Sequence, residues 1–165
     1  MDETSIAPLE RAQCEEAGRI VASNPLWADR YRYPAERARA DLDEALARGD
    51  LVLGAAHGAL VPGATPGPAG ELVGFAWVLP KGAFGRYPYL RLIAVSAGAQ
   101  GGGAGQRLLA EVEARVRPAR QLLLMVSDFN EGAQRFYARN GYAQVGSCPD
   151  FLVDGIAEQI WMKRL

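Results

Sequence analysis

The chain has 165 residues, of which 49% are hydrophobic and 22% are charged, and its mean hydropathy is -0.07. These values exclude a disordered or collagen-like chain and predict one compact domain over residues 1–165. The helices and strands predicted along the chain make this an α/β (α+β) domain. The formal net charge is -1, from 19 acidic and 18 basic residues. With a net charge this close to zero, the molecule as a whole has no electrostatic attraction for nucleic acid or an anionic membrane. We expect neither as a partner.

Cysteine and histidine are scarce. Cys14, Cys148 and His57 are the only residues of these two types, too few for a disulfide framework or a Cys/His zinc cluster. The first twenty residues lack the basic start and apolar run of a secretory signal, and no segment reaches the roughly 18 apolar residues of a membrane span. We therefore expect a cytoplasmic protein that binds no metal.

Two amphipathic helices are predicted in the first third of the chain. Residues 9–24 and 34–48 both carry apolar side chains at helical spacing, and both segments are bounded by proline or glycine. The connection between them contains three aromatic residues, Trp27, Tyr31 and Tyr33. Aromatic side chains in a connection can line a ligand site or pin the loop to the core. We favour pinning, because composition alone is weak evidence for a ligand site.

From residue 51 the pattern changes to that of strands. Segments 51–61, 72–79 and 89–96 are rich in branched and aromatic residues. The intervening segments 62–70 and 80–88 are rich in proline and glycine, which predicts loops. These three strands are therefore expected to form an antiparallel meander.

The second half predicts a strand, helix, strand unit followed by a strand pair. A helix is expected over about residues 104–116, and the apolar run 121–127 is typical of a strand buried on both faces in a parallel pair. A further helix covers about residues 130–139, with strands at 142–147 and 156–163. We expect a mixed, mostly antiparallel sheet of six to seven strands flanked by about four helices.

A glycine-rich turn separates the strand ending near residue 96 from the next helix. It reads Gln100-Gly101-Gly102-Gly103-Ala104-Gly105. The amides of such a turn and the start of a helix together form an anion site suited to phosphate or pyrophosphate. A flexible connection is the alternative that glycine content alone leaves open.

Two well-known phosphate loops do not fit this turn. A Walker-type loop needs lysine after its last glycine, whereas Gly103 is followed by Ala104, and a dinucleotide fingerprint needs glycine where Gln106 stands. Asp128 ends the next strand, where a ribose-binding acid belongs in a dinucleotide fold. A nucleotide-binding domain that uses residues 101–105 therefore stays as an alternative.

Two motifs together resemble a known family. The segment from Val95 through Gln100 to Gly103 and Gly105 is similar to the Gln/Arg-x-x-Gly-x-Gly/Ala signature of the GNAT superfamily of acyl-CoA N-acyltransferases. A second motif is similar to Asn-x-x-Ala-x-x-Phe-Tyr-x-x-x-Gly-Tyr, and here consists of Asn130, Ala133, Phe136, Tyr137, Gly141 and Tyr142. The resemblance is specific over residues 89–142.

The resemblance implies a sheet whose fourth and fifth strands splay apart, with acetyl-CoA or another acyl-CoA as co-substrate. The strand backbone before the turn would pair with the pantetheine arm, and the amides of the turn would hold the pyrophosphate. The implied coenzyme-binding residues are Ile93, Ala94, Val95, Gln100, Gly101, Gly102, Gly103, Ala104, Gly105 and Asn130. Asn130 is also expected to be a helix N-cap. The turn lacks the basic residue and the leading proline common in the family, which predicts a more flexible loop.

Acyl transfer to an amine requires a neutral amine and a proton for the departing thiolate. A thiol has a pKa of about 8.5 and a tyrosine about 10, so a well-placed phenol can protonate the thiolate. Tyr137 matches the family's general-acid tyrosine. The alternative is that Ala133, Phe136 and Tyr137 form a buried stripe at helical spacing.

The general base is left open among three carboxylates in or beside strands: Glu71, Asp128 and Glu158. Three arginines can meet phosphates or simply lie in solvent: Arg107, Arg135 and Arg139. Arg91 can hold a carboxylate on the acceptor, and the lone His57 is more typical of a structural residue.

The sequence thus predicts an acetyl-CoA-dependent N-acetyltransferase that acts on a primary amine of a small molecule or peptide. A non-catalytic acyl-CoA-binding module and a nucleotide-binding domain are the alternatives. The acceptor site would be shaped by the first two helices, the aromatic connection and residues 148–156, which do not identify the amine. The resemblance also implies that the last strands can take part in a homodimer.

Overall fold

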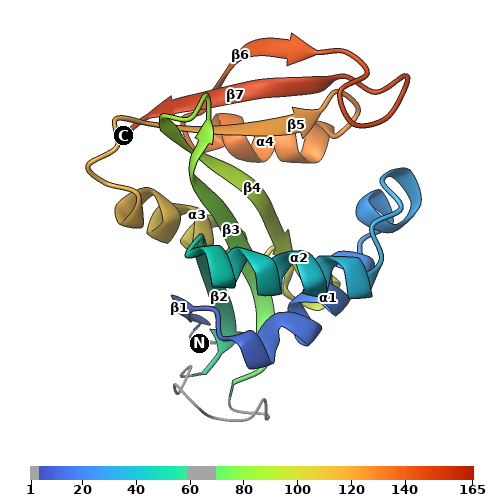
Figure 1. The fold of residues 1–165 in the computed structure, drawn as a ribbon, viewed down its shortest axis with the longest axis vertical. Coiled ribbons are helices and arrows are strands. Elements are labelled where there is room, and N and C mark those ends of the chain that lie inside the picture. Colours follow the sequence, from blue (N-terminus) through green and yellow to red (C-terminus); the bar gives the residue numbers. More distant parts are fainter. Residues whose placement is uncertain (1–3, 59–69) are drawn as a thin grey trace. The chain divides into compact units, whose positions relative to one another are not determined.

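The computed structural model describes residues 4–58 and 70–165. Seven strands form one mixed sheet in the order β1-β2-β3-β4-β5-β7-β6 (Figure 1). Their bounds are Thr4–Pro8 for β1, Leu51–His57 for β2, Leu72–Ala83 for β3, Tyr87–Val95 for β4, Gln121–Ser127 for β5, Ala143–Cys148 for β6 and Glu158–Arg164 for β7. The expected sheet of six to seven strands is confirmed.

Four α-helices lie in the described residues, together with three short helical turns. The α-helices are Cys14–Ala22 (α1), Ala35–Arg48 (α2), Ala104–Arg115 (α3) and Glu131–Arg139 (α4). The short turns are the 3-10 helices Arg11–Gln13 (η1) and Ala97–Ala99 (η3) and the π-helix Leu26–Arg30 (η2). Within residues 4–58 and 70–165, no helix combines the length and apolar character needed to cross a membrane.

The chain divides into two compact units. The first comprises residues 1–77 and 92–112, and the second comprises residues 78–91 and 113–165. Strands β3 and β4 and helix α3 contribute residues to both units, because each crosses one of these boundaries.

In the first unit, α1 and α2 pack side by side (Figure 1). Their core-facing residues recur three or four positions apart, as an amphipathic helix requires. These residues are Ala17, Ile20 and Val21 on α1, and Ala38, Leu42 and Ala45 on α2, all at most 6% exposed. They join Phe75 of β3 and Leu92 of β4 in one apolar cluster.

The start of the first unit differs from the sequence expectation. Residues 4–8 form β1, which pairs antiparallel with β2 from Thr4–His57 to Pro8–Leu53. The helix expected over residues 9–24 is split into η1 and α1, with α1 beginning at Cys14. A strand as short as β1 has too few residues to show a clear alternation in sequence. Its conformation therefore depends on the pairing with β2.

In the second unit, β7 lies between β5 and β6 and pairs antiparallel with both. β5 pairs in parallel with β4 through two residue pairs, Tyr89–Leu123 and Leu90–Leu124. The predicted parallel pair is thus confirmed.

The prediction of a loop over residues 80–88 is wrong. β3 continues to Ala83 and β4 begins at Tyr87, so a tight turn of three residues joins them, closed by Arg86 N donating to Ala83 O at 3.1 Å. Pro80 and Pro88 therefore lie within strands. A proline keeps its carbonyl acceptor and an extended backbone, and a strand tolerates it where the ladder needs no N–H. Most of the other expected loop, residues 62–70, lies outside the described residues.

Candidate functional site

The glycine-rich loop joins β4 to α3 within the first unit. Gly101 and Gly103 have φ angles of +82° and +85°, in the left-handed region that other residues avoid. No atom lies within 4 Å of the position that a Cβ would take at either residue. The loop therefore requires glycine at these two positions for its backbone conformation and not for packing.

Backbone donors gather where this loop becomes α3. Arg107 N donates to Gly103 O at 3.0 Å, the first bond of the helical pattern. The amides of residues 104–106 precede that bond, so they have no carbonyl one turn earlier in the helix. The same end of the helix carries about half a positive charge. This arrangement suits a phosphate or diphosphate group, as the sequence indicated.

The last residues of β4 lie close to β3 in the first unit. Ser96 N donates to Val73 O at 2.8 Å, and a Cβ at Gly74 would stand 2.8 Å from Ala94 O. Ala94 is 6% exposed, whereas Ile93 and Val95 are half-buried. Gln100 turns back toward the strand, with Nε2 donating to Val95 O at 3.5 Å. The strand end and the loop thus form one connected segment.

A cavity of about 180 Å³ lies beside this loop in the first unit. Its lining consists of Thr4 and His57 and of the loop residues Gly98, Ala99, Gln100, Gly102 and Ala104. Arg107, considered above as a phosphate ligand, donates from Nη1 to Thr4 O at 3.1 Å and so ties α3 to β1.

Tyr137 lies on α4 in the second unit and is 6% exposed. Its ring packs edge to face against Phe136 and Tyr142, with centroid distances of 5.2 and 5.5 Å. Its hydroxyl makes no hydrogen bond within residues 4–58 and 70–165. Burial, and to a smaller extent Tyr89, raises the pKa of Tyr137 above that of an ordinary tyrosine. Ala133 and Phe136 are only half-buried, so Tyr137 is the buried member of the predicted stripe. Tyr137 keeps its proton at neutral pH.

Tyr142, the last residue of the same motif, has a different environment. Its hydroxyl donates to Glu113 Oε1 at 3.0 Å, and Lys163 Nζ lies 2.7 Å from Glu113 Oε2. Burial and the Glu113 carboxylate raise the pKa of Tyr142. This tyrosine is engaged in holding α3, the start of β6 and β7 together. Sequence reasoning missed Glu113 and Lys163, because their partners are distant in the chain.

The remaining α4 candidates have structural partners. Asn130 Oδ1 accepts from Ala133 N at 3.1 Å, which confirms the N-cap. Arg135 pairs with Glu131 one turn earlier at 3.1 Å, and both side chains are more than half exposed. Arg139 is exposed near the end of the same helix. Arg135 thus contributes to a solvent-facing ion pair.

The three carboxylates considered as bases differ sharply in burial. Glu71 and Asp128 are exposed, whereas Glu158 is 4% exposed. Asp128 Oδ2 accepts from Ala157 N at 3.4 Å, and Asp128 N donates to Ala157 O, so this residue fastens the turn after β5. Glu158 Oε1 accepts from Ser127 Oγ at 3.3 Å. The structure thus singles out Glu158 as the buried acid.

Tyr89 lies on the β4 segment of the second unit, and its pKa responds to Arg91 and to this acid. Burial raises the pKa of Tyr89, Arg91 lowers it and Glu158 raises it. Sequence reasoning considered Arg91 but missed Tyr89 and Ser127. The available signal for Ser127 was its position as the polar end of a nearly continuous apolar run.

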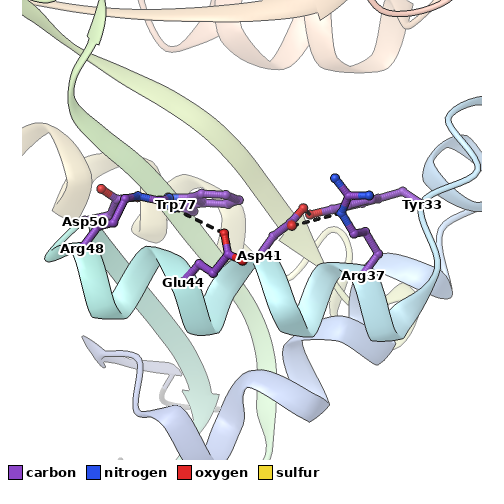
Figure 2. Close-up of polar contacts among 7 residues, drawn as sticks. All are labelled: Tyr33, Arg37, Asp41, Glu44, Arg48, Asp50 and Trp77. Atoms are coloured by element: carbon purple, nitrogen blue, oxygen red, sulfur yellow. Dashed lines mark hydrogen bonds and ion pairs between the residues drawn. The ribbon is translucent and has the colours of Figure 1, made fainter.

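A hydrogen bond from Tyr33 to α2 and apolar packing hold the aromatic connection of the first unit (Figure 2). Trp27 and Tyr33 pack against the apolar cluster, and Tyr33 Oη donates to Asp41 Oδ2 at 2.7 Å. Trp77 Nε1 donates to Asp50 Oδ2 at 2.9 Å. Figure 2 shows the Tyr33 and Trp77 side chains with their partners Asp41 and Asp50 along α2. The contacts favour the interpretation that the aromatic residues hold the connection in place.

No group of three or more histidine, cysteine, aspartate or glutamate side chains is placed to hold a metal ion in the part of the chain that the structure describes.

Comparison with known proteins adds a family and a fold. The model of the acetyltransferase (GNAT) family matches residues 22–142. A blasticidin-S acetyltransferase from Streptomyces morookaense is 35% identical over 99 residues, which are 59% of this chain and 66% of that protein. The match thus spans slightly less than two thirds of that relative's length.

Solved structures of GNAT-type acetyltransferases share the fold. An acetyltransferase of the GNAT family from Bacillus cereus has a TM-score of 0.74 at 16% identity, covering 98% of this chain and 97% of its own. PaiA N-acetyltransferase from Thermoplasma acidophilum, solved in complex with coenzyme A, has a TM-score of 0.69 at 19% identity and covers 99% of both chains.

Proposed function

Because the chain belongs to the GNAT acetyltransferase family, we propose that it transfers an acetyl group from acetyl-CoA to a primary amine of a small molecule or peptide. The observation that carries this proposal is the span of the family match, residues 22–142, which includes both the glycine-rich loop and Tyr137. The loop supplies donors for a diphosphate, and Tyr137 supplies a buried, protonated phenol. In this proposal residues 1–165 act as one N-acetyltransferase domain.

We assign the binding of acetyl-CoA to the end of β4 and the loop. Ile93, Ala94 and Val95 offer strand backbone to the pantetheine arm, and the amides of residues 100–105 hold the pyrophosphate. Two features support the assignment. Gly101 and Gly103 adopt the left-handed backbone conformation, and α3 begins directly after them at Ala104. Asn130 Oδ1 is occupied by the N-cap bond, so its amide nitrogen is the group that would contact the coenzyme.

In the proposed mechanism Tyr137 gives a proton to the departing thiolate. When bound, acetyl-CoA supplies the thioester whose acyl group is transferred. The raised pKa keeps the phenol fully protonated before the reaction, and it also makes the phenolate costly in free energy. Donation by Tyr137 is therefore favourable only if the proton lost by the attacking amine resupplies it.

The acceptor is proposed to be a small-molecule or peptide amine, and blasticidin S is the first compound to test, because a relative 35% identical over 99 residues bears that name. We also propose a cytoplasmic enzyme that can form a homodimer. β6 supports the dimer, since it lies at the edge of the sheet and Val145 on it is 53% exposed.

Thermal unfolding of the purified protein tests the coenzyme assignment. Acetyl-CoA, CoA, NAD and ATP are each added at about a hundred times the expected dissociation constant. A ligand bound at that excess adds about 2.7 kcal/mol to the free energy of unfolding, which raises the Tm by roughly 5–10 °C. Stabilisation by the CoA compounds alone supports the proposal. Stabilisation by NAD or ATP alone contradicts it and favours the nucleotide-binding alternative.

Release of the CoA thiol then separates an enzyme from a non-catalytic binding module. The protein is mixed with acetyl-CoA and with blasticidin S, a simple alkylamine or a peptide with a free N-terminus. The proposal predicts amine-dependent release. Binding of acetyl-CoA without release in the presence of any of these amines favours the binding module.

A further inference from the structure

A buried polar pair joins two strands of the second unit. Ser127 and Glu158, 5% and 4% exposed, are the hydrophilic residues that lie buried in the described part of the chain. They are register partners on β5 and β7, and Ser127 Oγ donates to Glu158 Oε1 at 3.3 Å. A buried carboxylate costs free energy that an apolar residue of similar shape would not cost. Packing alone therefore does not account for this pair.

The register fixes the face of the sheet on which this pair lies. Residues an even number apart on a strand share a face, and register partners share it too. Tyr89 pairs with Leu123, four residues before Ser127, so Tyr89 lies on the face of Ser127 and Glu158. Lys163 is five residues from Glu158 and lies on the opposite face.

Other titratable groups share this face. Tyr87 and Arg91 lie two residues before and after Tyr89 on β4. Arg164 lies six residues after Glu158 on β7, and Cys148 of β6 is the register partner of Glu158. Besides burial, Glu158 raises the pKa of Tyr89, and Tyr89 in turn raises the pKa of Tyr137 of α4. Electrostatic effects thus link the buried carboxylate to the proposed acid through Tyr89.

We propose that Glu158 removes the proton from the ammonium group of the acceptor, and that Ser127 positions the carboxylate for this step. The inference rests on the proposed function and names the base that acyl transfer requires. The acceptor R–NH3+ gives one proton to Glu158 and becomes R–NH2. Its nitrogen then forms the bond to the thioester carbonyl carbon, and the carbon–sulfur bond breaks.

The protons balance in this scheme. The attacking nitrogen loses a second proton, which replaces the one that Tyr137 gives to the thiolate. Glu158 finally releases its proton to solvent. The sum is R–NH3+ plus acetyl-CoA giving the acetylated amine, CoA thiol and one free proton.

The test is the pH dependence of kcat/KM in the Glu158→Gln variant, measured as CoA thiol release with an alkylamine whose pKa is near 10.4. We expect a loss of about 100-fold or more at pH 7. Without the carboxylate only the neutral amine reacts, so the variant's kcat/KM should rise about tenfold per pH unit. The wild type should stay level over the same range. A loss that is equal at every pH, or no loss, overturns the inference.

Ser127→Ala gives a second readout if Glu158→Gln does not fold. Loss of the hydroxyl donor removes the hydrogen bond that Ser127 gives to Glu158, so kcat should fall about tenfold while the KM for acetyl-CoA changes less than about twofold. An unchanged kcat contradicts the inference. Glu131→Gln, an exposed charge change in the same unit, should leave kcat and this KM unchanged. If the wild type releases no thiol with any amine, the proposed function fails, and the inference falls with it.

Discussion

The glycine-rich loop of the first unit and the β5–β7 region of the second unit offer different kinds of chemistry. In the loop, the functional groups are backbone amides of residues 100–105, and the left-handed backbone of Gly101 and Gly103 gives the loop its shape. In the β5–β7 region and α4, the groups are the buried side chains of Ser127, Glu158 and Tyr137. Backbone donors can hold a charged coenzyme, whereas only titratable side chains can move protons.

Because of this difference, we expect the affinity for acetyl-CoA and the rate of acyl transfer to depend on different residues. Changes in the loop should alter the affinity for acetyl-CoA and leave the rate at saturation nearly intact. Changes to the buried side chains should lower the rate and leave the affinity for acetyl-CoA nearly intact. Substitutions that alter both together would break this separation.

The largest effect after Glu158→Gln is expected for Tyr137→Phe. Loss of the general acid should lower kcat by roughly 100-fold or more, with the KM for acetyl-CoA changed less than about twofold. The Tyr137 hydroxyl makes no hydrogen bond in the described residues, so the Tm should change little. CoA thiol release and thermal unfolding measure the two quantities. An unchanged kcat removes Tyr137 from the mechanism.

Gly103→Ala tests the loop. Alanine in the left-handed region costs roughly 1–2 kcal/mol, so we expect the KM for acetyl-CoA to rise about tenfold while kcat is retained. Gly98→Ala is the matched control, because Gly98 has no positive φ and no atom within 4 Å of a Cβ position. Equal effects of the two changes would show that the left-handed conformation is not what the coenzyme requires.

Tyr142→Phe should lower the stability and leave the rate nearly unchanged, whereas Tyr137→Phe should lower the rate and leave the stability nearly unchanged. It removes the hydrogen bond to Glu113, a charged acceptor, and should cost about 2 kcal/mol, or a Tm decrease of about 4–8 °C. The rate at saturation should fall less than about threefold. Thermal unfolding and thiol release at a temperature well below the Tm provide the comparison. A large loss of kcat without loss of stability would place Tyr142 in the chemistry.

The smallest predicted effect is a difference in the rates at which a thiol reagent labels the two cysteines. Burial, with a contribution from Asp43, raises the pKa of Cys14 to about 11 from its usual 9.0. At pH 8 only about one thiol in a thousand is then ionised, so a thiol reagent should label half-buried Cys148 well before Cys14. The unfolded thiol ionises first, so the stabilising contribution of Cys14 should be complete below pH 9 and decline as the pH rises toward 11. Mass spectrometry of partially labelled protein gives the order, and early labelling of Cys14 contradicts it.

The elements with strong local signals were predictable. α2, α3, β5 and α4 have apolar periodicity, caps or continuous apolar runs, and their bounds lie within one or two residues of the prediction. β1 was missed, and β3 and β4 extend into the expected proline-rich loop, because strand pairing overrides weak or contrary local preferences there.

The candidate site was predictable in its motifs but not in its distant contacts. The loop and the N-cap of Asn130 follow from local sequence, and the structure bears out both as local conformations. No local pattern distinguishes Glu158 from Glu71 or Asp128. Its burial depends on the pairing of β7 with both β5 and β6, which are separated from each other by α4.

The most direct test of the central claim follows wild-type protein with acetyl-CoA, with and without each amine, by thiol release and by mass spectrometry of the acceptor. The account predicts thiol release that depends on the amine and an acceptor that gains one acetyl group on nitrogen for each thiol released. Tight binding of acetyl-CoA with no acetylated amine in any mixture would contradict it.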